Sequence, residues 1–132
     1  NYKAFCRLLH KSIKAVVMKN LIKLEDLGFF LLSLYFFNET GHNWWLYLIL
    51  ILLPDIGMVG YAFNKKIGAI IYNVFHHSGL AILFILFGWM SLSEYLALAG
   101  IILLSHASMD RIFGYGLKYP DDFKHTHIQE LG

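Results

Sequence analysis

The chain has 132 residues, of which 58% are hydrophobic and 15% are charged, with a formal net charge of +2. A soluble domain this short could not bury so much apolar surface, since ordinary domains are about 45–50% apolar and about 25% charged. The composition predicts an all-α integral membrane protein in contact with a lipid bilayer. It excludes nucleic acid as the main partner, because the Lys and Arg residues are confined to three short stretches.

Residues 1–20 contain no acidic side chain, and apolar residues such as Phe5, Leu9 and Ile13 recur there at helical spacing between Lys and Arg. This pattern predicts a basic amphipathic helix lying on a membrane surface. A plain cytoplasmic tail is one alternative. A targeting segment is another, but the pattern fits it less well.

A bundle of four transmembrane helices is expected over residues 21–113, with spans at about 21–37, 44–63, 67–89 and 95–113, followed by a polar tail at 114–132. A crossing needs about 20 residues, so the first span is long enough only if Glu25 enters the bilayer. Trp44 and Trp89 belong to an aromatic belt at one interface.

The distribution of positive charge predicts the orientation. Lys and Arg occur in the N-terminal segment, the Lys65–Lys66 turn and the C-terminal tail, whereas the turns at 38–43 and 91–94 have none. The positive-inside rule then places both termini in the cytoplasm of a multi-pass protein of the inner (plasma) membrane.

Each predicted span carries an ionisable residue at a similar depth. At 1.5 Å per residue, Asp55, Glu25, His76 and His106 lie roughly 17 to 20 Å from the outer ends of their helices. The hydrocarbon core is about 30 Å thick, so these four side chains share one layer near its middle. Ionisable groups at such depths usually face a bundle interior or a cavity.

Neighbouring residues extend this layer. Asp110 lies one turn from His106, Asn73 shares a face with His76, and Arg111 follows at the helix end. Pro54 removes a backbone donor and should kink the helix beside Asp55.

Carboxylates and imidazoles at one level are suited to a Zn, Fe or Mn ion, to acid–base catalysis or to a proton relay. The predicted metal ligands are Glu25, Asp55, His76, His106 and Asp110, of which the last four are also the predicted catalytic residues. A set of packing residues is the alternative, and the Glu-x-x-His signature of di-iron bundles is absent.

The C-terminal tail leaves the last span through two glycines and contains His125-Thr126-His127. A His-x-His pair can bind metal, although surface histidines in a flexible tail are the more common case. If the tail folds back over the bundle, Lys118 or Lys124 could meet an anionic headgroup or substrate.

The segments 54–61, 72–76, 106–119 and 123–127 resemble an uncharacterised family of small bacterial four-helix membrane proteins described as a domain of unknown function. Tyr61 is in the first of these segments. The resemblance implies an inner-membrane location and four spans, and it implies no activity. The sequence departs from the family pattern around Met109 and at 128–131.

Two functions follow as hypotheses. In the first, the polar layer is a cytoplasm-facing site of a metal-dependent enzyme acting on a lipid-like or hydrophobic substrate, with Asn73, Tyr61, Arg111 and Lys118 as binding or structural residues. In the second, the protein is a non-enzymatic carrier, proton relay or small subunit that works as a homo-oligomer or with a membrane-complex partner.

Overall fold

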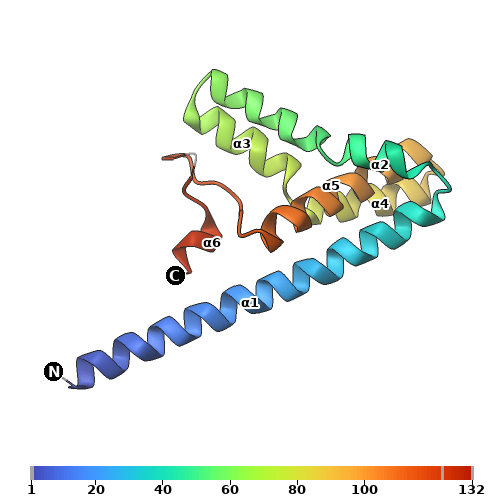
Figure 1. The fold of residues 1–132 in the computed structure, drawn as a ribbon. Coiled ribbons are helices and arrows are strands. Elements are labelled where there is room, and N and C mark those ends of the chain that lie inside the picture. The colour runs from blue at the N-terminus through green and yellow to red at the C-terminus, as the bar shows by residue number, and fades with distance from the viewer. Residues whose placement is uncertain (1, 123, 132) are drawn as a thin grey trace.

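The computed structural model describes residues 2–122 and 124–131, and its regular elements there are all helical, which confirms the predicted all-α class. Figure 1 shows a long helix running beside a bundle of shorter ones, with the tail folded against the end of that bundle. The elements in chain order are α1 (Tyr2–Glu39), α2 (Trp44–Leu50), the 3-10 helix η1 (Leu53–Ala62), α3 (Lys65–Phe75), α4 (Ser78–Met90), α5 (Glu94–Ile112) and α6 (His127–Glu130).

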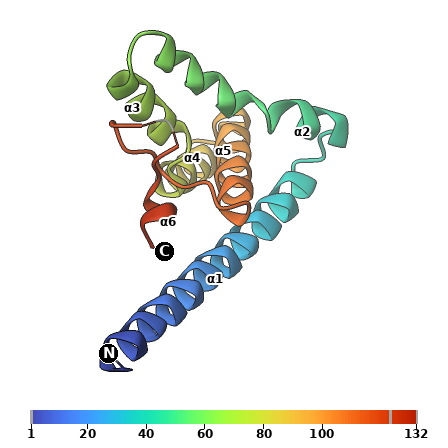
Figure 2. The ribbon, with the colours of Figure 1, turned by 60° about the vertical axis from the view of Figure 1, so that its left-hand side comes forward.

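Helix α1 is continuous over 38 residues, or about 57 Å at 1.5 Å per residue. One helix therefore runs without a break through both the predicted interfacial segment (1–20) and the predicted first span (21–37). The C-terminal half packs on α5. The N-terminal half runs past α6, with which it lines a shallow pocket, and its first turns extend beyond the other helices (Figures 1 and 2).

The segment predicted as a second span changes its helix type at the proline. α2 ends at Leu50, and Pro54 lies in the first turn of η1. The Asp55 amide donates to the Leu52 carbonyl at 3.3 Å, a 3-10 hydrogen bond, so the Ile51 carbonyl has lost its α-helical donor. This agrees with the kink that a proline imposes, because proline has no N–H and clashes with the preceding turn.

The segment predicted as a third span, 67–89, is broken. α3 ends at Phe75, with His76 as its C-cap. The His77 ring accepts a hydrogen bond from the Leu80 amide at 3.2 Å and so caps the start of α4. The two helices are bent by 45° at this break.

The described residues do not contain four separate membrane spans. Trp44–Ala62 is long and apolar enough to cross a membrane, and the bent pair Lys65–Phe75 and Ser78–Met90 adds a second crossing if it is counted as one span. The helices that contain the predicted spans at 21–37 and 95–113 are not apolar enough to be counted as membrane spans by the same criterion of length and hydropathy. Charged residues near 23–26 and 110–111 shorten their apolar stretches, whereas a crossing needs about 20 residues.

Small residues let α4 and α5 pack closely. A Cβ added at Gly100 would lie 2.6 Å from the Ala81 carbonyl oxygen and from the Ile85 amide nitrogen. The core beside this contact includes Phe37 of α1 and Tyr47 of α2, so α1, α2, α4 and α5 share one interior. Figure 1 shows the turn at 40–43 at the same end of the bundle as the α4–α5 connection, with the tail at the other end.

Candidate metal centre

Four ionisable side chains from three elements meet where η1, α3 and α5 approach one another. Asp55 comes from η1, His76 from the end of α3, and His106 and Asp110 from successive turns of α5. One ligand atom from each lies within 4.8 Å of the others. His76 and His106 are almost fully buried, whereas the Asp55 side chain is 42% exposed.

The spacing of three of these groups is that of ligands around one ion. The His76 and His106 Nε2 atoms are 3.0 Å apart, and Asp110 Oδ2 lies 3.3 Å from the first and 3.7 Å from the second. Ligands about 2.0–2.1 Å from a tetrahedral Zn²⁺ stand about 3.3 Å from one another. Asp55 Oδ1 lies 3.3 Å from His106 Nε2 and 3.8 Å from His76 Nε2, and Asp55 also lines the adjoining cavity.

Backbone carbonyls orient both imidazoles. His106 Nδ1 lies 2.5 Å from the Ile51 carbonyl, the group released by the proline, and His76 Nδ1 lies 2.8 Å from the Tyr72 carbonyl. A carbonyl only accepts, so each Nδ1 carries the proton and donates. Each Nε2 of a neutral ring therefore presents a lone pair to the cluster, the arrangement typical of metal-binding histidines.

Two lone pairs facing each other across 3.0 Å would repel, so a cation shared by the two Nε2 atoms would stabilise this pair. That cation is a proton or a metal ion. Two carboxylates beside the imidazoles add two negative charges and therefore favour the divalent ion.

Tyr72 supports two of the three closest ligands. Its hydroxyl donates to Asp110 Oδ2 at 3.1 Å, and its ring stacks on the His76 ring at a centroid distance of 3.7 Å. The sequence places Tyr72 one turn before His76, but the pattern does not indicate its bond to Asp110.

Arg111 stabilises the break between α3 and α4 at His76 and His77. Its guanidinium donates to the Ser78 hydroxyl at 2.8 Å, to the His76 carbonyl at 3.3 Å and to Asp26 Oδ1 at 3.4 Å. Arg111 is thus a structural residue that ties α1 and α4 to the end of α3.

Glu25 was predicted as a metal ligand, but it lies on the exposed side of α1 and is not among the four residues that meet in the cluster. The buried acid of this turn is Asp26. The helical phase could have identified it, since Asp26 precedes the buried Ser33 and Phe37 by seven and eleven residues.

The tail is attached to α3 beside the cluster. The Asn73 side chain accepts from the Lys118 amide at 2.7 Å and donates to the Lys118 carbonyl at 2.8 Å. The Lys118 ammonium lies 4.2 Å from the centre of the Tyr72 ring and 5.4 Å from that of Tyr61. Burial lowers the pKa of Lys118, although Asp110 and Asp55 oppose the shift.

The two tail histidines do not converge on one point. His125 contacts Asp121 at 2.7 Å and Glu130 at 2.9 Å, and the hydrogen bond to Asp121 raises the pKa of His125. His127 instead accepts from the Leu117 amide at 2.8 Å. Both rings hold the tail in its folded form.

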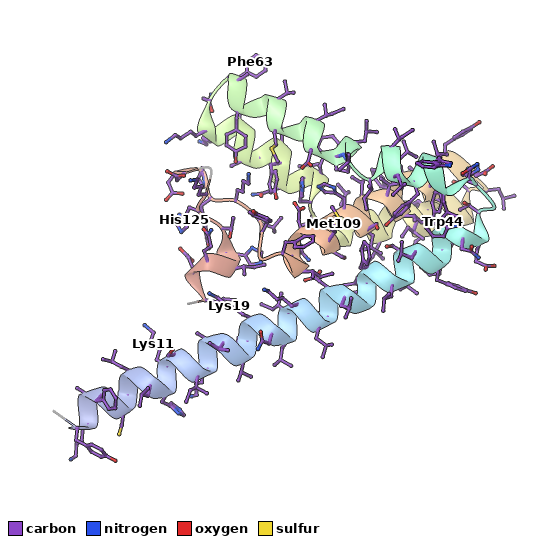
Figure 3. All side chains as sticks on the ribbon, in the orientation of Figure 1. Lys11, Lys19, Trp44, Phe63, Met109 and His125 are labelled. Carbon is purple, nitrogen blue, oxygen red and sulfur yellow. The ribbon has the colours of Figure 1, made fainter. Side chains whose placement is uncertain are left out.

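A cavity of about 550 Å³ lies between the cluster and the tail. Asp55 and Asp110 line it, together with Lys118 and Lys124 of the tail. Figure 3 shows the same arrangement of elements with side chains, with Met109 on α5 and His125 in the tail as guides. The cluster is therefore accessible from a space large enough for a small ligand.

A family model described as a domain of unknown function, DUF4260, matches residues 19–131. The chain belongs to the DUF4260 family. The DUF4260 match covers all four residues of the cluster, and it begins after most of the extended part of α1. No curated protein and no solved structure matches the chain.

Proposed function

We propose that the chain is a membrane-embedded, metal-dependent hydrolase. His76, His106 and Asp110 hold one divalent ion, and Asp55 acts on the water bound at the fourth position. The observation that carries this proposal is the pair of Nε2 lone pairs facing each other at 3.0 Å beside two carboxylates.

Asp55 is assigned a different role from the other three because its environment differs. Each of the three closest ligands is oriented by a hydrogen bond: His76 by the Tyr72 carbonyl, His106 by the Ile51 carbonyl and Asp110 by the Tyr72 hydroxyl. Asp55 is the most exposed of the four and lines the cavity. Catalytic zinc sites use three protein ligands and keep one position for water. Zn²⁺ is the preferred ion, and Fe²⁺ or Mn²⁺ would accept the same donors.

A divalent ion held by these residues would supply a water of lowered pKa, about 7, as a nucleophile at neutral pH. Asp55 would take the proton of that water as its oxygen attacks the electrophilic atom of an ester. The ester bond to the leaving oxygen breaks, and Asp55 returns the proton to that oxygen. One water is consumed, and an acid and an alcohol are released.

The apolar surface supports a membrane location and a lipid-like or hydrophobic substrate. Large apolar side chains are exposed along the helices, including Leu52, Ile56, Val59, Ile70 and Leu83. Monomeric soluble proteins rarely expose contiguous apolar patches of this kind. We place the protein in a bacterial inner membrane, with the Lys65–Lys66 end and both termini on the cytoplasmic side.

The extended half of α1 fits the same placement. Exposed apolar residues such as Phe5, Leu9 and Ile13 are interspersed with basic residues along it, including Lys11 and Lys19, which Figure 3 labels. Such a helix lies in the headgroup region of an anionic membrane.

A proton relay, either alone or as a small subunit of a larger membrane complex, is the second candidate. The observation in its favour is that the His76–His106 distance of 3.0 Å also suits one shared proton. In that case the imidazole pair would bind a proton in place of the metal.

Reconstitution with Co²⁺ separates the two candidates, because tetrahedral Co²⁺ with nitrogen ligands absorbs visible light. We expect the wild type to develop this absorption and the His106→Ala variant to lose it. His77→Asn is the matched control, since Asn can still cap α4 while an adjacent imidazole is removed.

The division of roles is tested with Asp55→Asn and p-nitrophenyl esters as probes. We expect this variant to keep its Co²⁺ absorption and to lose hydrolysis that the wild type shows. Loss of the metal by Asp55→Asn would instead indicate a closed four-ligand site. A wild type that binds no metal, and whose His106→Ala variant is equally stable, would refute the hydrolase.

A further inference from the structure

The cavity beside the cluster is lined by groups of both charges. They are the carboxylates of Asp55 and Asp110 and the lysines Lys118 and Lys124 of the tail. Tyr115 and Met58 also line it and contribute apolar surface. A ligand in this space would contact the cluster and the lysines at once.

Lys118 is held in place before any ligand arrives. Its backbone makes two hydrogen bonds with Asn73, and it pairs with Thr126 in an antiparallel bridge. The residue is 7% exposed, and its ammonium stands over the Tyr72 ring, whose hydroxyl bonds to Asp110. The positive charge is thereby fixed one side chain away from the proposed metal position.

Burial lowers the pKa of Lys118, which means that its ammonium is poorly solvated. An anion entering the cavity would stabilise the charged form. The rigid attachment of the residue also reduces the entropy lost on binding.

The charges on the cavity wall determine which ligand it favours. The two carboxylates and the two ammonium groups cancel, so a divalent ion on the cluster leaves the cavity with two positive charges. A dianion restores neutrality, whereas a phosphodiester or carboxylate monoanion leaves one charge unbalanced. A volume of about 550 Å³ holds a phosphate group with the first part of an attached chain.

We propose that this cavity binds phosphate monoesters, with one phosphate oxygen at the metal and the others at Lys118 and Lys124. The proposal rests on the metal site of the proposed function. The phosphate monoester can belong to a lipid headgroup or to a soluble molecule, and the chemistry that recognises it is the same.

The test uses the full chain loaded with Co²⁺, whose visible spectrum changes when an anion binds to the metal. Inorganic phosphate is titrated into protein in detergent, and the second arm uses nanodiscs with phosphatidic acid or, for comparison, phosphatidylglycerol. A response to phosphatidic acid only assigns the site to lipid headgroups. A response to inorganic phosphate only assigns it to soluble esters, and both results support the proposal.

Lys118→Gln removes the charge and keeps a polar side chain that is one atom shorter. We expect it to weaken phosphate binding by roughly ten- to a hundred-fold, the effect of one hydrogen bond to a charged group. Lys118→Arg should retain most of the binding. Lys66→Gln is the matched control, because Lys66 is an exposed lysine outside the cavity.

The outcomes distinguish this inference from the proposed function. Wild type that binds Co²⁺ but responds to neither phosphate probe would overturn the phosphate site and leave the metal site intact. The same holds if Lys118→Gln and Lys66→Gln bind phosphate equally well. Failure of the wild type to bind Co²⁺ would overturn both. Each variant is first checked for its Co²⁺ spectrum, so that a misfolded protein is recognised.

Discussion

Replacing Tyr72 with phenylalanine removes a single oxygen atom from the surroundings of the proposed metal. The hydroxyl donates to Asp110 Oδ2 at 3.1 Å, and the residue is 2% exposed. The ring, which stacks on His76 and lies under the Lys118 ammonium, is retained in the variant. The substitution therefore tests one hydrogen bond to one proposed ligand.

The expected effect is a ten- to hundred-fold loss of metal affinity, the usual cost of removing a partner that orients a ligand. This corresponds to about 1.4 to 2.7 kcal/mol, since each tenfold change equals about 1.4 kcal/mol. The same range is expected for one hydrogen bond to a charged acceptor, about 1.5 to 3 kcal/mol.

Metal affinity is measured by competition with a chromophoric chelator on the purified protein in detergent. Tyr47→Phe is the matched control, because Tyr47 is also buried but its hydroxyl bonds to Ser105 rather than to a ligand. Equal affinities for wild type and Tyr72→Phe would refute the reasoning. An equal loss in Tyr47→Phe would show that the effect is not specific to Asp110.

Three further predictions concern the scaffold. Asp26→Asn should cost about 3 kcal/mol in thermal unfolding followed by circular dichroism, because it leaves the partly buried Arg111, whose side chain is 17% exposed, without its carboxylate. Gly100→Leu should destabilise the chain by at least about 1–3 kcal/mol by forcing α4 and α5 apart, whereas Gly28→Ala, with open space around it, should not. Equal melting temperatures of the two variants would contradict the close packing of α4 on α5. The pKa of His125 is raised by hydrogen bonds to tail carboxylates, so the folded tail should be favoured below about pH 6.5 and should loosen as the pH rises through the raised value. Amide hydrogen exchange of the tail, compared with the pH-insensitive variant His125→Gln, would detect this change.

Counting residues along predicted helices was enough to bring Asp55, His76 and His106 to one level, and the structure places them together with Asp110. The count works because the rise per residue is nearly constant and because ionisable side chains avoid lipid. This count predicts only the depth of a residue in the membrane. The direction in which a side chain points depends on the phase of its helix, and for this reason Glu25 was preferred to its buried neighbour Asp26.

The breaks in the helices were less visible in the sequence. Pro54 indicates one of them because its chemistry forbids the α-helical hydrogen bond. The bend after His76 has no proline at the break. It depends on the local cap formed by His77 and on a contact from elsewhere in the chain, the guanidinium of Arg111. The tail is fixed in the same way by Asn73, at a sequence separation that no local pattern reveals.

The central claim is that His76, His106 and Asp110 hold a divalent metal ion. Elemental analysis of the full chain, purified in detergent without chelators, tests it most directly when the wild type and His76→Ala are compared with the control His77→Asn. The account predicts one Zn, Fe or Mn ion per chain in the wild type and the control, and almost none in His76→Ala. Substoichiometric metal in the wild type, or equal metal in all three proteins, would contradict it.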